Sequence, residues 1–249
     1  MSDVRPARET TVPLTLPVLL SFVAGYVDSY TFLTLFGLFV AQVTSSFVMA
    51  GAEIVIHDYS VTAKLLVVVV FVVAGSLTAA LIAWARQAGH AALPSMLVLE
   101  AALLAIFAAM LLYGPKVTDA RDWNGIVAGL VAAAAMGAQS VLVRLLMKGV
   151  PQTNVMTGNM TQLAVAATEL VFAWRQLRDS RHTPGDLAEF TEARSRLLTV
   201  LFIALGFLVG AALGAIAFAV TGLHGVAFAP VIVGALALWA LYIERRART

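Results

Sequence analysis

The side chains of this sequence that could do chemistry are few, and their densest cluster lies in one short stretch. The motif "NVMTGNMTQLA", residues 154–164, places two Asn, two Thr, a Gly and a Gln between long runs of Ala, Val, Leu and Phe. A regular helix in lipid satisfies its own backbone and needs no such cluster. At the start of a helix, polar side chains and free N–H groups can bind an anion or a polar solute. The alternative use of such residues is hydrogen bonding between helices.

A second and less polar cluster, "AQVTSSF", occupies residues 41–47 in the first half of the chain. Gly37 precedes the first cluster and Gly149 precedes the second, and both interrupt helices. We therefore predict two discontinuous elements, each an extended stretch followed by a helix that starts near the bilayer midplane, with Thr44 or Thr157 as its N-cap. The residues predicted to line one shared solute site are Gln42, Thr44, Ser45, Ser46, Asn154, Thr157, Gly158, Asn159, Thr161 and Gln162.

Ionisable residues inside apolar segments are the other candidates, because a carboxylate at that depth is costly and by default functional. Asp28 lies near the middle of the first segment and leads into the first cluster, so we expect it to be a proton- or cation-coupling group. Its counterparts in the second half, Gln139 and Ser140, are polar without charge. Glu100 and Glu169 are secondary candidates, since either could instead lie toward the membrane surface.

The elements that must position these residues follow from composition. Hydrophobic residues make up 61 % of the 249 positions and charged residues 12 %, with a mean hydropathy of +0.91. These values predict an all-α integral membrane protein, because about 20 apolar residues span a bilayer as a helix and barrel-like alternation is missing. Eight apolar segments are predicted, at about 13–36, 38–56, 61–85, 93–113, 125–147, 153–174, 197–221 and 226–243.

All eight segments are assigned to one membrane domain, residues 1–249. The first segment has no small-residue cleavage site and is predicted to be a transmembrane helix, not a removable signal peptide. The charged stretch 175–196 is predicted to be a cytoplasmic, solvated loop with a short surface helix.

The two halves of the chain resemble each other. Gly25 matches Gly137, Asp28 falls on Ser140, and the triplet 44–46 falls on the triplet 157–159. The third segments carry small-residue stripes, and the fourth segments each have a proline near the start. The stripe of the first half is Gly75, Ala79 and Ala83, and it matches Gly206, Gly210 and Gly214 of the second half. The two matching prolines are Pro94 and Pro230. This order indicates two structural repeats of four segments, about 13–113 and 125–243.

The repeats are parallel if all eight segments cross the membrane, and inverted if the second and sixth segments are re-entrant. Matching connections of the two halves differ in their number of Lys and Arg residues. For example, the connection before the third segment of the first half has Lys64 alone, whereas the matching stretch 175–196 of the second half has several Arg residues. A charge excess that changes sides is what inverted repeats require. We therefore favour inversion. The small-residue stripes leave open whether they pack the repeats together or pair two copies of the chain.

The motifs "FVAGYVDSYTFL", "GLFVAQVTSSFV" and "PQTNVMTGNMTQLA" resemble the YoaK-like family of bacterial inner-membrane proteins, whose function is not established. The resemblance extends over almost the whole chain. It implies a multi-pass protein of the bacterial inner membrane with about six spans and a transport-related role. Members of that family typically have "TGN" in both halves, whereas the first copy here reads Thr44, Ser45, Ser46.

The function that these patterns favour is a transporter or facilitator of a small polar or anionic solute in the lipid bilayer. A membrane-embedded enzyme acting on a lipid-like substrate is an alternative, and a non-catalytic scaffold is another. The chain has no Cys, and its four His fall at segment ends without ligand spacing. We therefore expect no metal, no cofactor and no nucleic-acid partner.

Overall fold

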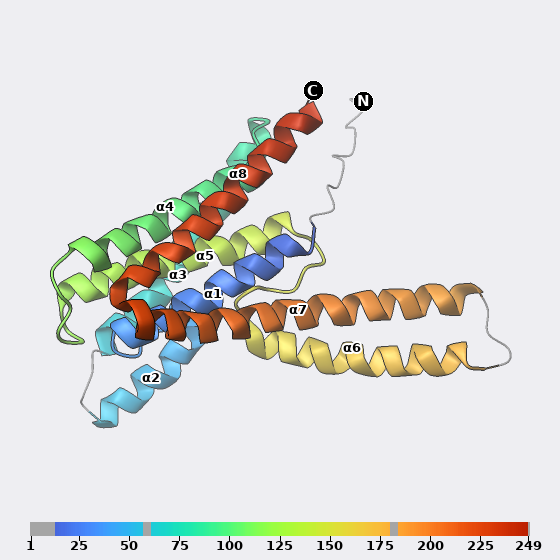
Figure 1. The fold of residues 1–249 in the computed structure, drawn as a ribbon, viewed down its shortest axis with the longest axis horizontal. Coiled ribbons are helices and arrows are strands. Elements are labelled where there is room, and N and C mark those ends of the chain that lie inside the picture. The colour runs from blue at the N-terminus through green and yellow to red at the C-terminus, as the bar shows by residue number, and fades with distance from the viewer. Residues whose placement is uncertain (1–12, 57–60, 180–183, 249) are drawn as a thin grey trace.

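The computed structural model describes residues 13–56, 61–179 and 184–248, and these residues form helices and no strands. Figure 1 shows an elongated bundle from which one helical hairpin projects. In chain order the helices are α1 (Thr15–Thr34), α2 (Val43–Ile56), α3 (Val61–Gln87), α4 (Ala92–Tyr113), α5 (Trp123–Leu146), α6 (Met156–Leu177), α7 (Pro184–Thr221), the 3₁₀ turn η1 (Gly222–Ala227) and α8 (Phe228–Arg248).

Five helical segments are long and apolar enough to cross a bilayer. They are α1, α3, α4, α5 and the continuous run Gly185–Arg246, which contains most of α7, η1 and most of α8. Many large apolar side chains point outward, including Val72 at 60 % and Val231 at 65 % exposure, as expected for helices whose outer faces meet lipid tails. The chain is therefore an all-helical, multi-pass membrane protein, which confirms that part of the sequence prediction.

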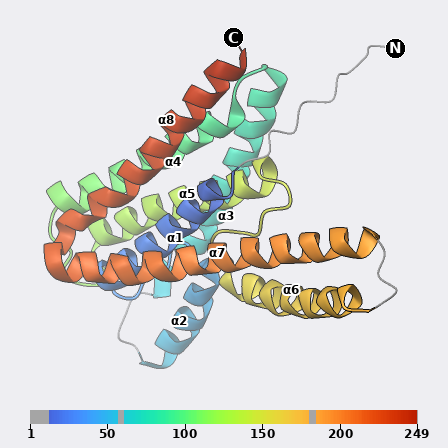
Figure 2. The same ribbon diagram turned by 45° about the vertical axis from the view of Figure 1, so that its right-hand side comes forward.

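The hairpin of α6 and α7 differs from the sequence prediction. Residues 175–196 are not mainly a loop, because α6 continues to Leu177 and α7 begins at Pro184 and runs for 38 residues. Proline suits the first position of a helix, where its missing N–H is not needed, and Asp186 in the first turn favours the helix start. Charged and polar residues continue the same helix outside the apolar core, so α7 extends well past the start of α1 in Figure 2.

The helices pack through close backbone contacts. On α7, a Cβ added to Gly206, Gly210 or Gly214 would collide with carbonyl oxygens of α1, so these glycines let the two backbones touch. Gly75 likewise lies against Gly137 and Val141 of α5, whereas Ala83, at the far end of its predicted stripe, is exposed. The stripe on α7 is therefore a helix contact over its whole length, and the stripe on α3 is one only at its start.

The direction of each helix follows from these contacts. The pairs Val18–Gly206 and Tyr26–Gly214 show that α1 and α7 run parallel, and Figure 1 shows the two side by side. In contrast, α1 and α5 run in opposite directions. Leu20 near the start of α1 meets Gln139 near the end of α5, while Leu38 beyond the end of α1 meets Gly129 near the start of α5. Helix α4 completes the bundle by packing between α5 and α8.

Candidate functional site

The first broken element lies between α1 and α2. Phe36 and Gly37 adopt left-handed backbone angles, with φ of 54° and 75°, and turn the chain back toward the middle of α1. Residues 38–42 form no helix, so their N–H groups need other partners. Asp28 supplies them. Its Oδ1 accepts hydrogen bonds from the N–H groups of Val40 at 2.8 Å and Ala41 at 2.7 Å.

The second carboxylate oxygen of Asp28 accepts the N–H of Gln42 at 3.0 Å, and the residue is only 4 % exposed. Three N–H donors around one carboxylate form a cradle that favours its negative charge. Asp28 thus holds the unwound stretch against α1 and positions the start of α2. This geometry places Asp28 within hydrogen-bonding reach of the first polar cluster.

The second broken element, between α5 and α6, is held by neutral groups. Gly149 has a φ of 78°, and the chain that follows it returns into the bundle. The amide of Gln139 donates to Thr153 Oγ1 at 2.8 Å and to the carbonyl of Leu20 at 2.9 Å. Ser21 of α1 donates to the carbonyl of Thr153 at 2.9 Å. The buried amide Gln139 therefore connects this element to α1, while Ser140 lies 3.4 Å from Gln152 Oε1.

The two broken elements meet inside the bundle. The amide nitrogen of Asn154 donates to the carbonyl of Ala41 at 3.3 Å, so residues 113 positions apart in sequence are in contact. Asn154 is 3 % exposed, and its side-chain oxygen has no partner among the described residues. An unpaired acceptor at this junction is a place where a solute or a water could donate a hydrogen bond.

Neither Thr44 nor Thr157 is an N-cap, and that prediction is wrong. Helix α2 starts at Val43 and α6 at Met156, so both threonines lie within the first turn, and Val155 caps α6 without a side-chain bond. Instead, a residue further along each helix reaches back. Ser46 Oγ donates to the carbonyl of Phe39 at 3.1 Å, and Asn159 Nδ2 donates to the carbonyl of Gln152 at 2.7 Å. Both bonds span seven residues.

The predicted site residues divide by burial. Ser46, Asn154 and Asn159 are buried, and Gln42, Ser45 and Gly158 are half-buried. Thr44, Thr157, Thr161 and Gln162 are exposed. Of the buried members, Asn154 bonds across to the other element, whereas Ser46 and Asn159 each bond back within their own element.

Two cavities adjoin the broken elements. A cavity of about 250 Å³ beside the first is lined by Asp28, Gln42, Phe39 and residues of α7 that include Phe207. A cavity of about 400 Å³ beside the second is lined by Gly149, Pro151, Gln162 and polar residues of α7. Each cluster therefore contributes to its own cavity.

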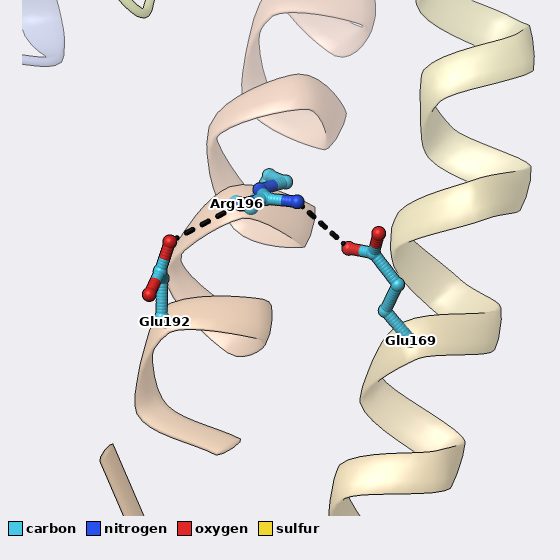
Figure 3. A network of polar contacts seen from close by, with 3 residues as sticks. All are labelled: Glu169, Glu192 and Arg196. Atoms are coloured by element: carbon cyan, nitrogen blue, oxygen red, sulfur yellow. Dashed lines mark hydrogen bonds and ion pairs between the residues drawn. The ribbon is translucent and has the colours of Figure 1, made fainter. Parts of the chain in front are cut away.

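The secondary carboxylates have different surroundings. Glu169 of α6 is 41 % exposed and pairs at 3.0 Å with Arg196 of α7, which also bonds to Glu192 (Figure 3). Glu100 is completely buried and has no hydrogen-bond partner among the described residues. No group of three or more His, Asp or Glu side chains in the described part of the chain is arranged to hold a metal ion.

One pair was missed at the sequence level. Glu53 of α2 forms a buried ion pair with Lys64 of α3, and both side chains are only 3 % exposed. In the sequence, Lys64 stands near the start of the third segment and indicates only a charged connection. The signal that could have indicated a partner is a Glu ten residues into the otherwise apolar helix α2.

The sequence was compared with known protein families. Residues 16–239 match the family described as protein of unknown function DUF1275, which is most of the chain. The chain belongs to the DUF1275 family. Searches among curated proteins and among solved structures gave no match to this DUF1275 protein. The broken elements and the charges around them are therefore the features that bear on its function.

Proposed function

We propose that this DUF1275 protein is a transporter or facilitator of a small polar or anionic solute. The observation that supports this most is the contact between two unwound stretches in the interior of the bundle, through Asn154 and Ala41. Irregular backbone at membrane depth is tolerated where protein surrounds it or where it lines a cavity, and transporters use such stretches as binding sites. The unpaired oxygen of Asn154 and the cavity beside each unwound stretch suit this use.

We further propose that the two halves are inverted repeats with six crossings. A Cβ on Gly25 of α1 would strike the carbonyl of Phe207 on α7, and a Cβ on Gly137 of α5 would strike the carbonyl of Phe71 on α3. If α1 corresponds to α5 and α3 corresponds to α7, the α1–α7 contact and the α5–α3 contact are equivalent. Since α1 and α5 run in opposite directions, the operation that relates the halves is an inversion of topology.

In this arrangement α2 and α6 are re-entrant. Helix α2 has 14 residues, about 21 Å of helix, which is too short to cross a hydrocarbon core of about 30 Å. In Figure 1 both α2 and α6 start in the middle of the molecule and leave toward opposite ends. Each element would thus enter and return on one side of the membrane.

The charges favour one orientation in the bacterial inner membrane. Lys116 and Arg121 belong to the α4–α5 connection and Lys64 to the first turn of α3, and Figure 1 shows that connection and the start of α3 at the same end of the bundle. Arg86 and Arg144 belong to the last turns of α3 and α5, at the opposite ends of those helices, and Figure 1 shows the tip of the α6–α7 hairpin and the C-terminus of α8 away from the α4–α5 connection. The richer end is assigned to the cytoplasm. This matches the architecture that the resemblance to the YoaK-like family implies.

Asp28 is the proposed coupling group. Charged Asp28 holds the N–H groups of Val40, Ala41 and Gln42, and protonation would weaken all three bonds at once. The first broken element would then loosen around the cavity that Asp28 and Gln42 line. Proton binding and opening of this element would be linked by that single carboxylate.

Thiol labelling tests the proposed cavity without knowledge of the solute, because the chain has no native Cys. A membrane-impermeant, charged thiol reagent is expected to label Gln42→Cys from the outer side and Gln162→Cys from the inner side of oriented vesicles. Val72→Cys is the matched control, because Val72 is 60 % exposed on the lipid-facing side of α3. Equal and slow labelling of Gln42→Cys and Val72→Cys would show a dry contact and would favour the scaffold.

A second experiment identifies the solute. Purified protein is screened for small polar and anionic compounds that raise its thermal midpoint, since a ligand of the folded state stabilises it by mass action. A compound that acts on the wild type but not on Asn154→Leu is then tested for uptake into proteoliposomes. Ser76→Ala is the control, because Ser76 is exposed and bonds only to the carbonyl of Val72 on its own helix.

The topology is tested in the same Cys-free background. Cys at position 119 is expected to label from outside, and Cys at positions 147 and 186 from the cytoplasm. Asp58 is also expected to face outward, like Asp119, but it lies outside the described residues. Labelling of positions 119 and 186 from one side would contradict the six-crossing inverted arrangement.

A further inference from the structure

Glu100 is the most isolated carboxyl group of the described chain. It lies in the middle of α4, is 0 % exposed, and neither of its side-chain oxygens has a hydrogen-bond partner among the described residues. Its neighbours on the buried face of α4 are apolar and include Leu97 and Leu104. A carboxyl group in such a place needs an explanation.

No charged group compensates Glu100. Helix α4 packs against α3, α5, η1 and α8, and the described titratable or charged residues on these elements are Lys64, Arg86, Arg144, His224, Tyr242, Glu244, Arg245 and Arg246. None of them bonds to Glu100. Lys64 bonds to Glu53, and the others lie toward helix ends or in the turn η1. An unpaired carboxylate in an apolar interior is strongly disfavoured, so the group takes up a proton instead.

Packing does not require the carboxyl group. Glu100 stands six residues after Pro94, and in the second half Leu236 stands six residues after Pro230 on α8. Leu236 is also buried, at 8 % exposure. Helix α8, which corresponds to α4 in the other half, therefore has an apolar side chain at the matching position. The acid at position 100 offers one thing that Leu cannot, which is an exchangeable proton.

We infer that Glu100 is a proton-binding site in the membrane interior of this protein. In the present conformation the site is filled, with the proton bonded to a carboxyl oxygen. When water reaches α4, the O–H bond breaks, the proton passes to water and the carboxylate remains; the return step reverses this. The inference goes beyond the proposed solute pathway, because a proton site at Glu100 does not depend on which solute crosses the membrane, or whether one does.

Infrared spectroscopy of the protein in lipid tests the site directly. A protonated carboxylic acid has a carbonyl stretching band that carboxylates and amides lack. We expect one such band in the wild type at neutral pH, its loss in Glu100→Gln, and its retention in Glu169→Gln. Glu169 is the matched control, because it is a partly exposed Glu that is paired with Arg196.

Exchange of the proton is tested in the same samples. Transfer to deuterated buffer is expected to shift the Glu100 band, and alkaline buffer is expected to remove it reversibly. If Glu100→Gln keeps every carboxylic-acid band of the wild type, Glu100 is charged and the inference is overturned. A Glu100 band that neither shifts in deuterated buffer nor responds to pH would also overturn it, because the proton would be trapped.

A chemical readout covers the case in which Glu100→Gln does not fold. Dicyclohexylcarbodiimide is apolar and reacts with protonated carboxyl groups, so in folded wild type it is expected to modify the peptide that contains Glu100, as found by mass spectrometry. Modification is expected to fall at alkaline pH. An unmodified Glu100 at neutral pH contradicts a filled proton site. Thiol labelling at Gln42→Cys is independent of this result, so the solute proposal and the proton site can fail separately.

Discussion

The two broken elements of this DUF1275 protein solve one problem with different chemistry. Both turn at a glycine with a positive φ, both return into the bundle, and in both a side chain reaches seven residues back to a carbonyl. The freed backbone of the first is held by the carboxylate Asp28, whereas the second is held by the neutral groups Gln139 and Ser21. The same backbone geometry is therefore compatible with charged and uncharged supports, and only the first can respond to a proton.

The ion pairs that join α2 to α3 and α6 to α7 differ in a similar way. Glu53 and Lys64 join α2 to α3 inside the protein, and Glu169 and Arg196 join α6 to α7 with both side chains partly exposed. Both pairs place the Glu on the shorter helix and the cation on the longer one. Burial is what separates their expected energies, because a charge left alone in the interior is far more costly than one at the surface.

The largest expected effect comes from breaking the buried pair. Lys64→Met should lower the free energy of unfolding by about 3–5 kcal/mol, because Glu53 remains buried without its cation. Arg196→Met should cost only about 0–1 kcal/mol, because its partners Glu169 and Glu192 are exposed and need no buried counter-charge. Unfolding in mixed detergent micelles measures both values.

The double variant Glu53→Met with Lys64→Met is the control for that prediction. Replacing both members of a buried pair by apolar residues is often neutral, so the double variant should recover most of the stability. If Lys64→Met and Arg196→Met cost the same amount, burial does not distinguish the two pairs in the membrane.

The next effect concerns the supports of the broken elements. Asp28→Asn should lower the free energy of unfolding by about 3 kcal/mol, because the new NH₂ group faces an N–H donor and the charge-assisted bonds are lost. Ser140→Ala, at the aligned position of the second half, should cost less, because Ser140 makes one long bond of 3.4 Å. Thermal midpoints in detergent compare the two, and an equal loss would contradict the special role of Asp28.

The glycine contacts should respond alike in the two halves. Gly25→Ala and Gly137→Ala each place a methyl group against a backbone carbonyl, of Phe207 and Phe71 respectively, so each should cost about 1–3 kcal/mol. Gly51→Ala is the control, because nothing lies within 4 Å of its added Cβ. A large loss for Gly25→Ala together with no loss for Gly137→Ala would weaken the proposed equivalence of the halves.

The smallest effect concerns Asp122, an exposed carboxylate that, like Asp28, accepts hydrogen bonds from backbone N–H groups. The N–H groups of Thr118 and Asp119 donate to the Asp122 carboxylate at 2.7 and 3.1 Å and lower its pKa. A lowered pKa in the folded state contributes stability above the unfolded pKa of about 3.9, and this contribution is lost as the pH falls through the folded value. Asp122→Asn should therefore slightly reduce stability at neutral pH and flatten its decline in acid. An unchanged pH profile would show that these bonds form equally in the unfolded chain.

Some site properties could be read from residues alone. Gly37 and Gly149 indicated where the helices break, and the positive φ of each is found in the structure. The polar clusters indicated where the chain re-enters the bundle, and Asp28 was singled out because it interrupts an apolar segment. The pairing of Glu53 with Lys64 could not be read in this way, because those residues lie on different helices and the angle between helices is not a local property.

The sequence by itself determined that this is an all-helical membrane protein with two interrupted elements. Those properties depend on hydropathy and on backbone preferences, which act over a few residues. Only the tertiary structure decided which neighbour each polar group meets. It placed Asp28 against three N–H groups and Asn154 against Ala41, and it left Glu100 without a partner. The physical reason is that hydrogen bonds and desolvation depend on distances of a few ångströms between helices, which packing fixes and local sequence does not.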